Sequence, residues 1–423
     1  MKIICAYTVN LDAVYNVNAL ELARLSSDLK PENQEKITRL EDLLSALLFC
    51  MKEGSGDELP IEREEVAVII ERAFHWEYRL GGNAGIMAGV LATLGAEPVL
   101  NASAIGRRMA EMLHPGIRIP VSGSLKEPLQ AVGDKEMIHF VFQFTEGQTI
   151  STSGGPIVSS KANRLIATYD PLNSRLYSSP DFDAYCQENI KDFDGAIVSG
   201  FHLVPIIGFK EIFDRKIEQI SSWKKANPGL YVHAEMGAFH EPEIMEYLLE
   251  RLPVDSLGMN EDELARVTSL KPGWRGTMEA VLQIRERLGL SRVAVHTRDY
   301  IISVMKGLIP PEREVEALTR GADAAAALAA TGSITGLPPD EVNPVGIDAR
   351  DEFLRDGAVP CGRGAYMSSG EDVISLVPSL LARHPKFTVG LGDTTTAAIF
   401  YEELLAKKGD RQYESLVHKG PLS

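Results

Sequence analysis

Apolar, strand-like runs alternate with amphipathic, helix-like segments over much of the second half of this 423-residue sequence, and no other feature constrains the fold as strongly. The apolar runs are short and rich in Val, Ile and Ala, which is typical of buried strands, and they cover residues 195–200, 229–233, 254–259 and 292–296. Helix-like segments cover residues 209–225, 241–252 and 262–270. Strands joined by helices of this length form right-handed βαβ units around a parallel sheet. The sequence therefore predicts an α/β fold.

The first half of the chain has a less regular pattern of strands and helices, which indicates a second, smaller domain. Residues 138–144 and 163–169 alternate or cluster as half-exposed strands. The Gly/Ser/Thr-rich residues 147–160 between them predict a loop. Residues 34–49 and 61–73 have helical patterns. We expect a β-rich domain inserted near the start of the α/β chain.

Composition excludes several classes of protein. Lys and Arg number 43 and Asp and Glu number 59, so the formal net charge is −16, which disfavours a nucleic-acid partner. No stretch approaches the roughly 20 apolar residues of a membrane span. The cysteines are scattered without a C-x-x-C pair, which predicts reduced thiols; they are Cys5, Cys50, Cys186 and Cys361. We expect a soluble, cytoplasmic protein.

The most specific motif is Gly390-Leu-Gly392-Asp393, which follows a predicted short strand and opens a predicted helix that runs to residue 407. Glycines let the backbone approach a ligand closely, and the free N–H groups of a first helical turn favour an anion. Asp393 could then accept a proton from an attacking hydroxyl beside a phosphoryl group held by those amides. The alternative is that Asp393 only caps the helix.

A second motif, Gly81-Gly82-Asn83, opens an apolar helix predicted over residues 85–94. Paired glycines make room for a ligand against the backbone, and Asn83 could bond to a hydroxyl. The alternative is a flexible helix start without a ligand.

Two acidic motifs follow predicted strands. His233 and Glu235 stand two residues apart at the end of one strand, where ligands of open α/β sheets collect, although solvated side chains would explain them equally well. Asn260 and Glu263 form a capping box, and a carboxylate there also suits Mg²⁺. Together the four motifs predict a phosphoryl-transfer site.

In their order along the chain, these motifs resemble those of the ADP-dependent sugar kinases, glucokinase and phosphofructokinase, within the ribokinase-like superfold. The resemblance covers nearly the whole chain and also includes an N-terminal strand ending in Asn10-Leu-Asp12 and the triplet Val295-His296-Thr297. It implies a mostly parallel sheet flanked by helices plus a small β-rich lid. The implied large domain covers residues 1–8, 81–116 and 181–423, and the implied lid covers residues 9–80 and 117–180. The compact segment 147–160 departs from the family pattern, so the resemblance does not define the size of the lid.

The resemblance also implies roles for individual residues. Family members transfer the β-phosphoryl group of ADP to a sugar hydroxyl and leave AMP. Asp393 would be the catalytic base, and Mg²⁺ would be positioned by Glu235, Glu263 and Asp393, directly or through water. The nucleotide would be held by Asn260, His296, Gly390 and Gly392. The sugar would face Asn10, Asp12, Glu77, Gly81, Gly82 and Asn83.

The identity of the sugar depends on a cluster of cationic and amide side chains. Fructose 6-phosphate brings a second phosphate, which Lys161, Asn163, Arg164 and Arg175 could meet, unless they form a solvated loop. By resemblance, a carboxylate at Glu77 accompanies glucose kinases. We therefore expect a glycolytic 6-phosphofructokinase that makes fructose 1,6-bisphosphate, with weaker glucose phosphorylation. The alternatives are a glucokinase or bifunctional enzyme, an ATP-dependent ribokinase-like kinase, and a non-catalytic regulator.

Overall fold

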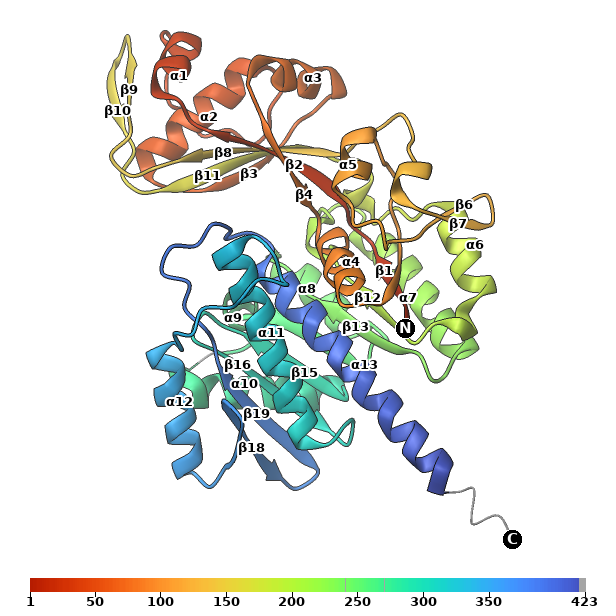
Figure 1. The fold of residues 1–423 in the computed structure, drawn as a ribbon. Coiled ribbons are helices and arrows are strands. Elements are labelled where there is room, and N and C mark those ends of the chain that lie inside the picture. The colour runs from red at the N-terminus through yellow and green to blue at the C-terminus, as the bar shows by residue number, and fades with distance from the viewer. Residues whose placement is uncertain (240, 270, 418–423) are drawn as a thin grey trace.

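The computed structural model describes residues 1–239, 241–269 and 271–417, and its largest element is a ten-stranded sheet (Figure 1). Six neighbouring strands are parallel, in the spatial order β5 (Glu97–Leu100), β1 (Lys2–Ala6), β12 (Gly195–Val198), β13 (Tyr231–Glu235), β14 (Ser256–Asn260) and β15 (Arg292–His296). Four antiparallel strands extend the sheet beyond β15, namely β16 (Tyr300–Lys306), β19 (Asp372–Pro378), β18 (Gly364–Ser369) and β17 (Val359–Cys361). The predicted α/β class is confirmed.

Helices cover both faces of this sheet, as buried parallel strands require. One face carries α4 (Asn83–Thr93), α5 (Arg107–Met112), α11 (Pro311–Thr331) and the long α13 (Leu391–Val417). The other face carries α6 (Pro180–Glu188), α7 (Phe209–Ala226), α8 (Pro242–Leu249), α9 (Glu261–Val267), α10 (Gly273–Leu288) and α12 (Pro344–Arg355). Short 3-10 helices cover Pro128–Gln130, Asn173–Arg175, Ile190–Asp192 and Phe201–Leu203. In the described part of the chain, no helix combines the length and the apolar character needed to cross a bilayer.

A second sheet lies over the carboxyl ends of the parallel strands (Figure 1). Its five strands run in the order β3 (Asp57–Pro60), β11 (Asn163–Tyr169), β8 (Ile138–Phe144), β2 (Asn10–Asn16) and β4 (Glu77–Gly81). One face packs on α1 (Ala19–Ser26), α2 (Leu40–Glu53) and α3 (Glu64–Ala73) through alternate residues such as Phe140 and Phe142. Because side chains alternate across a strand, the intervening residues His139, Val141 and Gln143 face the other way, toward the large domain.

Four local predictions were wrong. Residues 147–160 form an antiparallel hairpin of β9 (Thr149–Thr152) and β10 (Gly155–Val158), because Ile150 and Ile157 are buried against the small-domain core. The N-terminal strand ends at Ala6, and Asn10 to Asp12 instead open β2, since the chain crosses between the two sheets there. The strand predicted directly before Gly390 is absent from residues 382–389, and the helix predicted from residue 34 begins at Leu40. The end of the predicted helix at Leu270 lies outside the described residues.

The division of the chain into domains stays a prediction. A short hairpin of β6 (Ile119–Val121) and β7 (Ser124–Lys126) follows Arg118, which pairs with Val99 of β5 in the large sheet. This pairing favours a boundary later than residue 116 for the second lid segment.

Candidate active site

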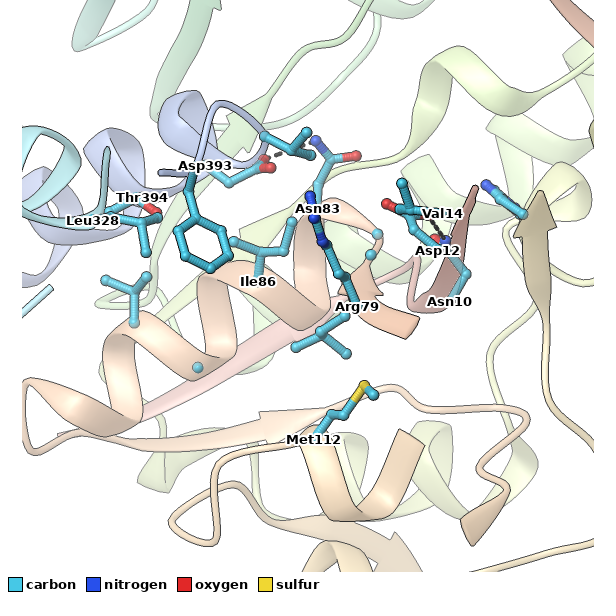
Figure 2. A pocket seen from close by; sticks show the side chains of 18 of the residues that line it. Asn10, Asp12, Val14, Arg79, Asn83, Ile86, Met112, Leu328, Asp393 and Thr394 are labelled. Atoms are coloured by element: carbon cyan, nitrogen blue, oxygen red, sulfur yellow. Dashed lines mark hydrogen bonds between the residues drawn. The ribbon is translucent and has the colours of Figure 1, made fainter. Parts of the chain in front are cut away.

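A cleft of about 850 Å³ lies between the small sheet and the large domain (Figure 2). Residues predicted from the sequence that line it are Asn10, Asp12, Gly81, Gly82, Asn83, Arg164 and Asp393. These residues come from strands β2, β4 and β11 of the small sheet and from the start of helices α4 and α13 of the large domain, and thus from nearly the whole length of the chain. The tertiary fold therefore gathers one site from motifs that are far apart in the sequence.

Asp393 lies in the first turn of α13, where the helix N-terminus favours a negative charge. Its Oδ1 accepts a hydrogen bond of 2.7 Å from Asn83 Nδ2, and Figure 2 shows the two side chains next to each other in the cleft wall. Burial raises the pKa of Asp393 to about 6, and the charge of Glu235 adds to the increase. A carboxylate with this pKa is ionised at neutral pH and can accept a proton from a hydroxyl in the cleft.

Gly390 and Gly392 shape the approach to Asp393 in different ways. Gly390 has a φ of +73°, a conformation that favours glycine. A Cβ on Gly392 would lie 2.8 Å from His296 Cε1, so only glycine lets the helix start pack this closely on β15. Neither residue lines the cleft, and their predicted contact with the nucleotide stays a prediction.

The small sheet presents a row of polar side chains across its strands. Arg79 of β4 is the register partner of Asp12 in β2, and Asp12 is the partner of His139 in β8. All three line the cleft. Asn10 Nδ2 donates to Asp12 Oδ1 at 2.8 Å, and burial raises the pKa of Asp12 above its ordinary value. A Cβ on Gly81 would lie 2.5 Å from both of these side-chain atoms, which explains the glycine there.

Arg79 and His139 were not predicted from the sequence, and neither were Gln143 and His202, which also line the cleft. The period-two alternation in residues 138–144 contains the signal for two of them, because it separates His139 and Gln143 from the buried Phe residues. No local pattern distinguishes His202, which follows a strand and belongs to a short 3-10 helix.

Glu235 is the centre of a buried hydrogen-bond network beneath the start of α13. Its Oε1 is 3.0 Å from His296 Nε2, and its Oε2 is 3.4 Å from His233 Nε2 and accepts from Thr396 Oγ1 at 2.9 Å. Burial alone would raise the pKa of Glu235, but the bonds with His233 and His296 outweigh it and lower the pKa to about 2. The alternative of solvated side chains at His233 and Glu235 is wrong, since both are buried.

The Asn260 and Glu263 capping box is confirmed. Asn260 Oδ1 accepts from Glu263 N at 2.9 Å, while Glu263 Oε2 accepts from Asn260 N at 3.0 Å and its Oε1 accepts from Asn260 Nδ2 at 2.9 Å. Burial raises the pKa of Glu263 to about 7, with Glu235 and Asp393 adding to the increase. Glu263 is therefore electrostatically coupled to the catalytic candidate although neither it nor Glu235 lines the cleft.

The remaining predicted residues lie outside the cleft. One oxygen of Glu77 accepts two hydrogen bonds from Arg79, at 2.9 and 3.1 Å. Asn163 Nδ2 donates to the carbonyl oxygen of Gly54 at 3.2 Å, whereas Lys161 and Arg175 are exposed. Of the four residues proposed for an acceptor phosphate, Arg164 alone reaches the cleft wall in the described part of the chain.

Comparisons with known proteins identify the family of the chain. A family model described as the ADP-specific phosphofructokinase/glucokinase conserved region matches residues 1–402. The chain is 26% identical to the ADP-specific phosphofructokinase of Thermococcus litoralis over 96% of this chain and 98% of that protein. It is also 26% identical to the ADP-dependent glucose/glucosamine kinase of Pyrococcus furiosus over 95% of this chain and 94% of that protein.

Solved structures share the fold. The crystal structure of a hypothetical ADP-dependent phosphofructokinase from Pyrococcus horikoshii superposes with a TM-score of 0.82 at 24% identity, covering 96% of this chain and 98% of that chain. An ADP-dependent kinase in complex with fructose 6-phosphate and ADPβS superposes with a TM-score of 0.76 at 22% identity, covering 96% of this chain and 94% of that chain.

Proposed function

Because the chain belongs to the ADP-specific phosphofructokinase/glucokinase family and is thus an ADP-dependent sugar kinase, we propose that its acceptor is fructose 6-phosphate. The products are then fructose 1,6-bisphosphate and AMP. Relatives named for either acceptor are equally similar to this chain, so the choice of sugar depends on the cleft. The main support for fructose 6-phosphate is that Asp393 of the large domain and Arg164 of the small sheet line the same cleft.

Asp393 is proposed as the base. The acceptor hydroxyl gives its proton to the carboxylate, its oxygen bonds to the β-phosphorus of ADP, and the bond from that phosphorus to the bridging oxygen breaks to release AMP. The Asn83 amide holds one carboxylate oxygen, which leaves the other for the proton. Backbone amides at the start of α13 suit the phosphoryl oxygens, and positioning and charge stabilisation supply most of the catalysis of such transfers.

Two features of the small sheet favour a sugar phosphate over glucose. Arg164 lines the cleft beside Gln143, its register partner on the adjacent strand β8, so a guanidinium and an amide are both available to phosphate oxygens. Glu77, the carboxylate associated with glucose, is bound by Arg79 and does not line the cleft. A neutral sugar would have to compete with Arg79 for it.

The decisive test measures product formation with ADP or ATP as donor and fructose 6-phosphate or glucose as acceptor. We expect AMP and fructose 1,6-bisphosphate from ADP and fructose 6-phosphate, with little turnover of ATP. Enzyme that uses glucose readily and ignores fructose 6-phosphate is a glucokinase. Enzyme that binds both ligands without forming AMP is a non-catalytic regulator.

Arg164→Ala should raise the KM for fructose 6-phosphate by roughly 10-fold or more, because a charge-assisted hydrogen bond to phosphate contributes about 1.5–3 kcal/mol. Any glucose activity should keep its KM. Arg175→Ala is the matched control, since Arg175 is exposed and does not line the cleft. An unchanged KM for fructose 6-phosphate in Arg164→Ala would show that Arg164 does not bind the acceptor.

We also propose that ADP binds with Mg²⁺, held through water by Glu235 and Glu263. Glu235 further raises the pKa of Glu263 and of Asp393 beyond the effect of burial, and a divalent cation relieves this repulsion. Both oxygens of each glutamate already accept hydrogen bonds, which fits ligation through water. Among the described residues, no group of three or more His, Cys, Asp or Glu could hold a metal ion without other ligands. When bound, the ion neutralises phosphate charge.

Glu263→Gln should raise the Mg²⁺ concentration needed for half-maximal activity about 10-fold, which is the lower range for residues that orient a metal through other ligands. The capping box should survive because Gln also serves at that position. Titration of Mg²⁺ at fixed ADP measures the effect. Asp262→Asn, in the same turn but exposed, is the control, and equal Mg²⁺ dependence in both variants would restrict Glu263 to capping.

A further inference from the structure

The carboxylate of Asp170 lies behind the small-sheet wall of the cleft and connects to it through one side chain. Its Oδ2 is 2.8 Å from His139 Nε2 and accepts from Asn173 Nδ2 at 2.6 Å, and its Oδ1 accepts from Asn173 N at 2.9 Å. The Asp170 side chain is only 7% exposed. His139 lines the cleft whereas Asp170 does not. Asp170 is therefore placed to influence a ligand through His139.

This contact decides which hydrogen bonds His139 can offer. With Nε2 bonded to Asp170, Nδ1 is the ring nitrogen left for a ligand: it accepts in the neutral ring and donates in the imidazolium. Burial by itself lowers the pKa of His139, but the bond and charge of Asp170, with the charges of Asp12 and Glu58, raise it above its ordinary value. Other titratable groups that line the cleft are Arg79, Arg164, Glu111, His114, His202 and Asp393.

Asn173 extends the same network to the residues that face the sugar. Its Nδ2 also donates to the carbonyl oxygen of Val9 at 3.1 Å, directly before Asn10. Asp12, two residues further, is the register partner of His139. Asp170 and Asn173 thus fix both the His139 ring and the start of β2.

We propose that Asp170 is a positioning residue for the acceptor, which holds His139 as an imidazolium so that Nδ1–H donates to an oxygen of the sugar phosphate. This inference rests on the proposed function, because it takes a phosphorylated sugar as the ligand. Asp170 itself makes no contact with the acceptor.

The test is a double-mutant cycle with Asp170→Asn and His139→Gln, in which KM and kcat for fructose 6-phosphate are measured across pH. Asp170→Asn should raise KM about 10-fold and leave kcat within a few-fold, because it weakens one charge-assisted bond in binding. In the wild type, KM should rise as His139 loses its proton, and in Asp170→Asn this rise should begin at lower pH. The double variant should bind no more weakly than His139→Gln.

The control is Asp42→Asn, since Asp42 accepts hydrogen bonds from Thr38 and Arg39 in the same domain but lies away from the cleft. Its KM and pH profile should match the wild type. Additive losses in the cycle, or an unshifted KM profile in Asp170→Asn, would overturn the proposal.

An NMR titration of the His139 ring in the unliganded wild type, assigned by its loss in His139→Gln, tests the pairing without the reaction. We expect its pKa above that of an exposed histidine, and an ordinary or lower value would also overturn the proposal. Because this readout needs no substrate, it separates failure of the inference from failure of the proposed acceptor.

Discussion

Asp393→Asn should lower kcat by about 10²–10⁴-fold, the range over which a general base typically contributes, while the KM values for ADP and sugar stay close to those of the wild type. Asn is nearly isosteric with Asp and also serves well at the start of a helix, so the fold should persist. The asparagine oxygen can still accept the bond from Asn83. The measurement is steady-state AMP formation, with circular dichroism to confirm folding.

The matched control is Asp181→Asn, which changes an exposed acid in the first turn of α6, away from the cleft. It should leave kcat unchanged. The wild-type pH profile gives a second check: because the pKa of Asp393 is raised to about 6, its proton-accepting form is lost as the pH falls through that value. Below the pKa of Asp393, kcat should fall about tenfold for each pH unit. If the kcat of Asp393→Asn stays within tenfold of the wild-type value, Asp393 only caps the helix and is not the base.

Arg292→Met should destabilise the large domain by about 3–5 kcal/mol, as expected when one partner is removed from a buried ionic cluster. Arg292 Nε on β15 lies 2.8 Å from Glu314 Oε1 of α11 and 2.5 Å from Glu403 Oε1 of α13. The three side chains are at most 1% exposed. Without the guanidinium, the buried carboxyl groups of Glu314 and Glu403 lose the cation that pairs with both of them.

Urea unfolding of the large domain measures this loss of free energy. Arg313→Met is the control, since Arg313 pairs with Glu316 on the surface of the same helix α11 and an exposed pair contributes about 0–1 kcal/mol. A variant with Arg292, Glu314 and Glu403 all replaced by apolar residues should recover much of the stability. Equal stability of Arg292→Met and Arg313→Met would show that the buried cluster contributes nothing.

Local patterns predicted the elements of the large domain well because the information lies within a few residues. Buried strands appear as short apolar runs, and the capping box of α9 appears as Asn260 followed by Glu263. The 147–160 hairpin was not predicted because this segment consists mostly of Gly, Ser and Thr, and its two buried residues, Ile150 and Ile157, are too few to show a strand pattern. Composition favoured a loop there, and packing against the small-domain core favoured strands.

Local sequence patterns were sufficient to predict the α/β class, the helix start with Asp393 and the two-glycine turn before Asn83. Which of these residues contact each other depends on the three-dimensional fold. Asn83 and Asp393 are 310 positions apart and share a hydrogen bond, and His139 finds Asp170 31 positions later, at the end of a neighbouring strand. Caps, turns and periodicity are encoded locally, whereas such contacts depend on strand order and register, which depend on how distant segments pack.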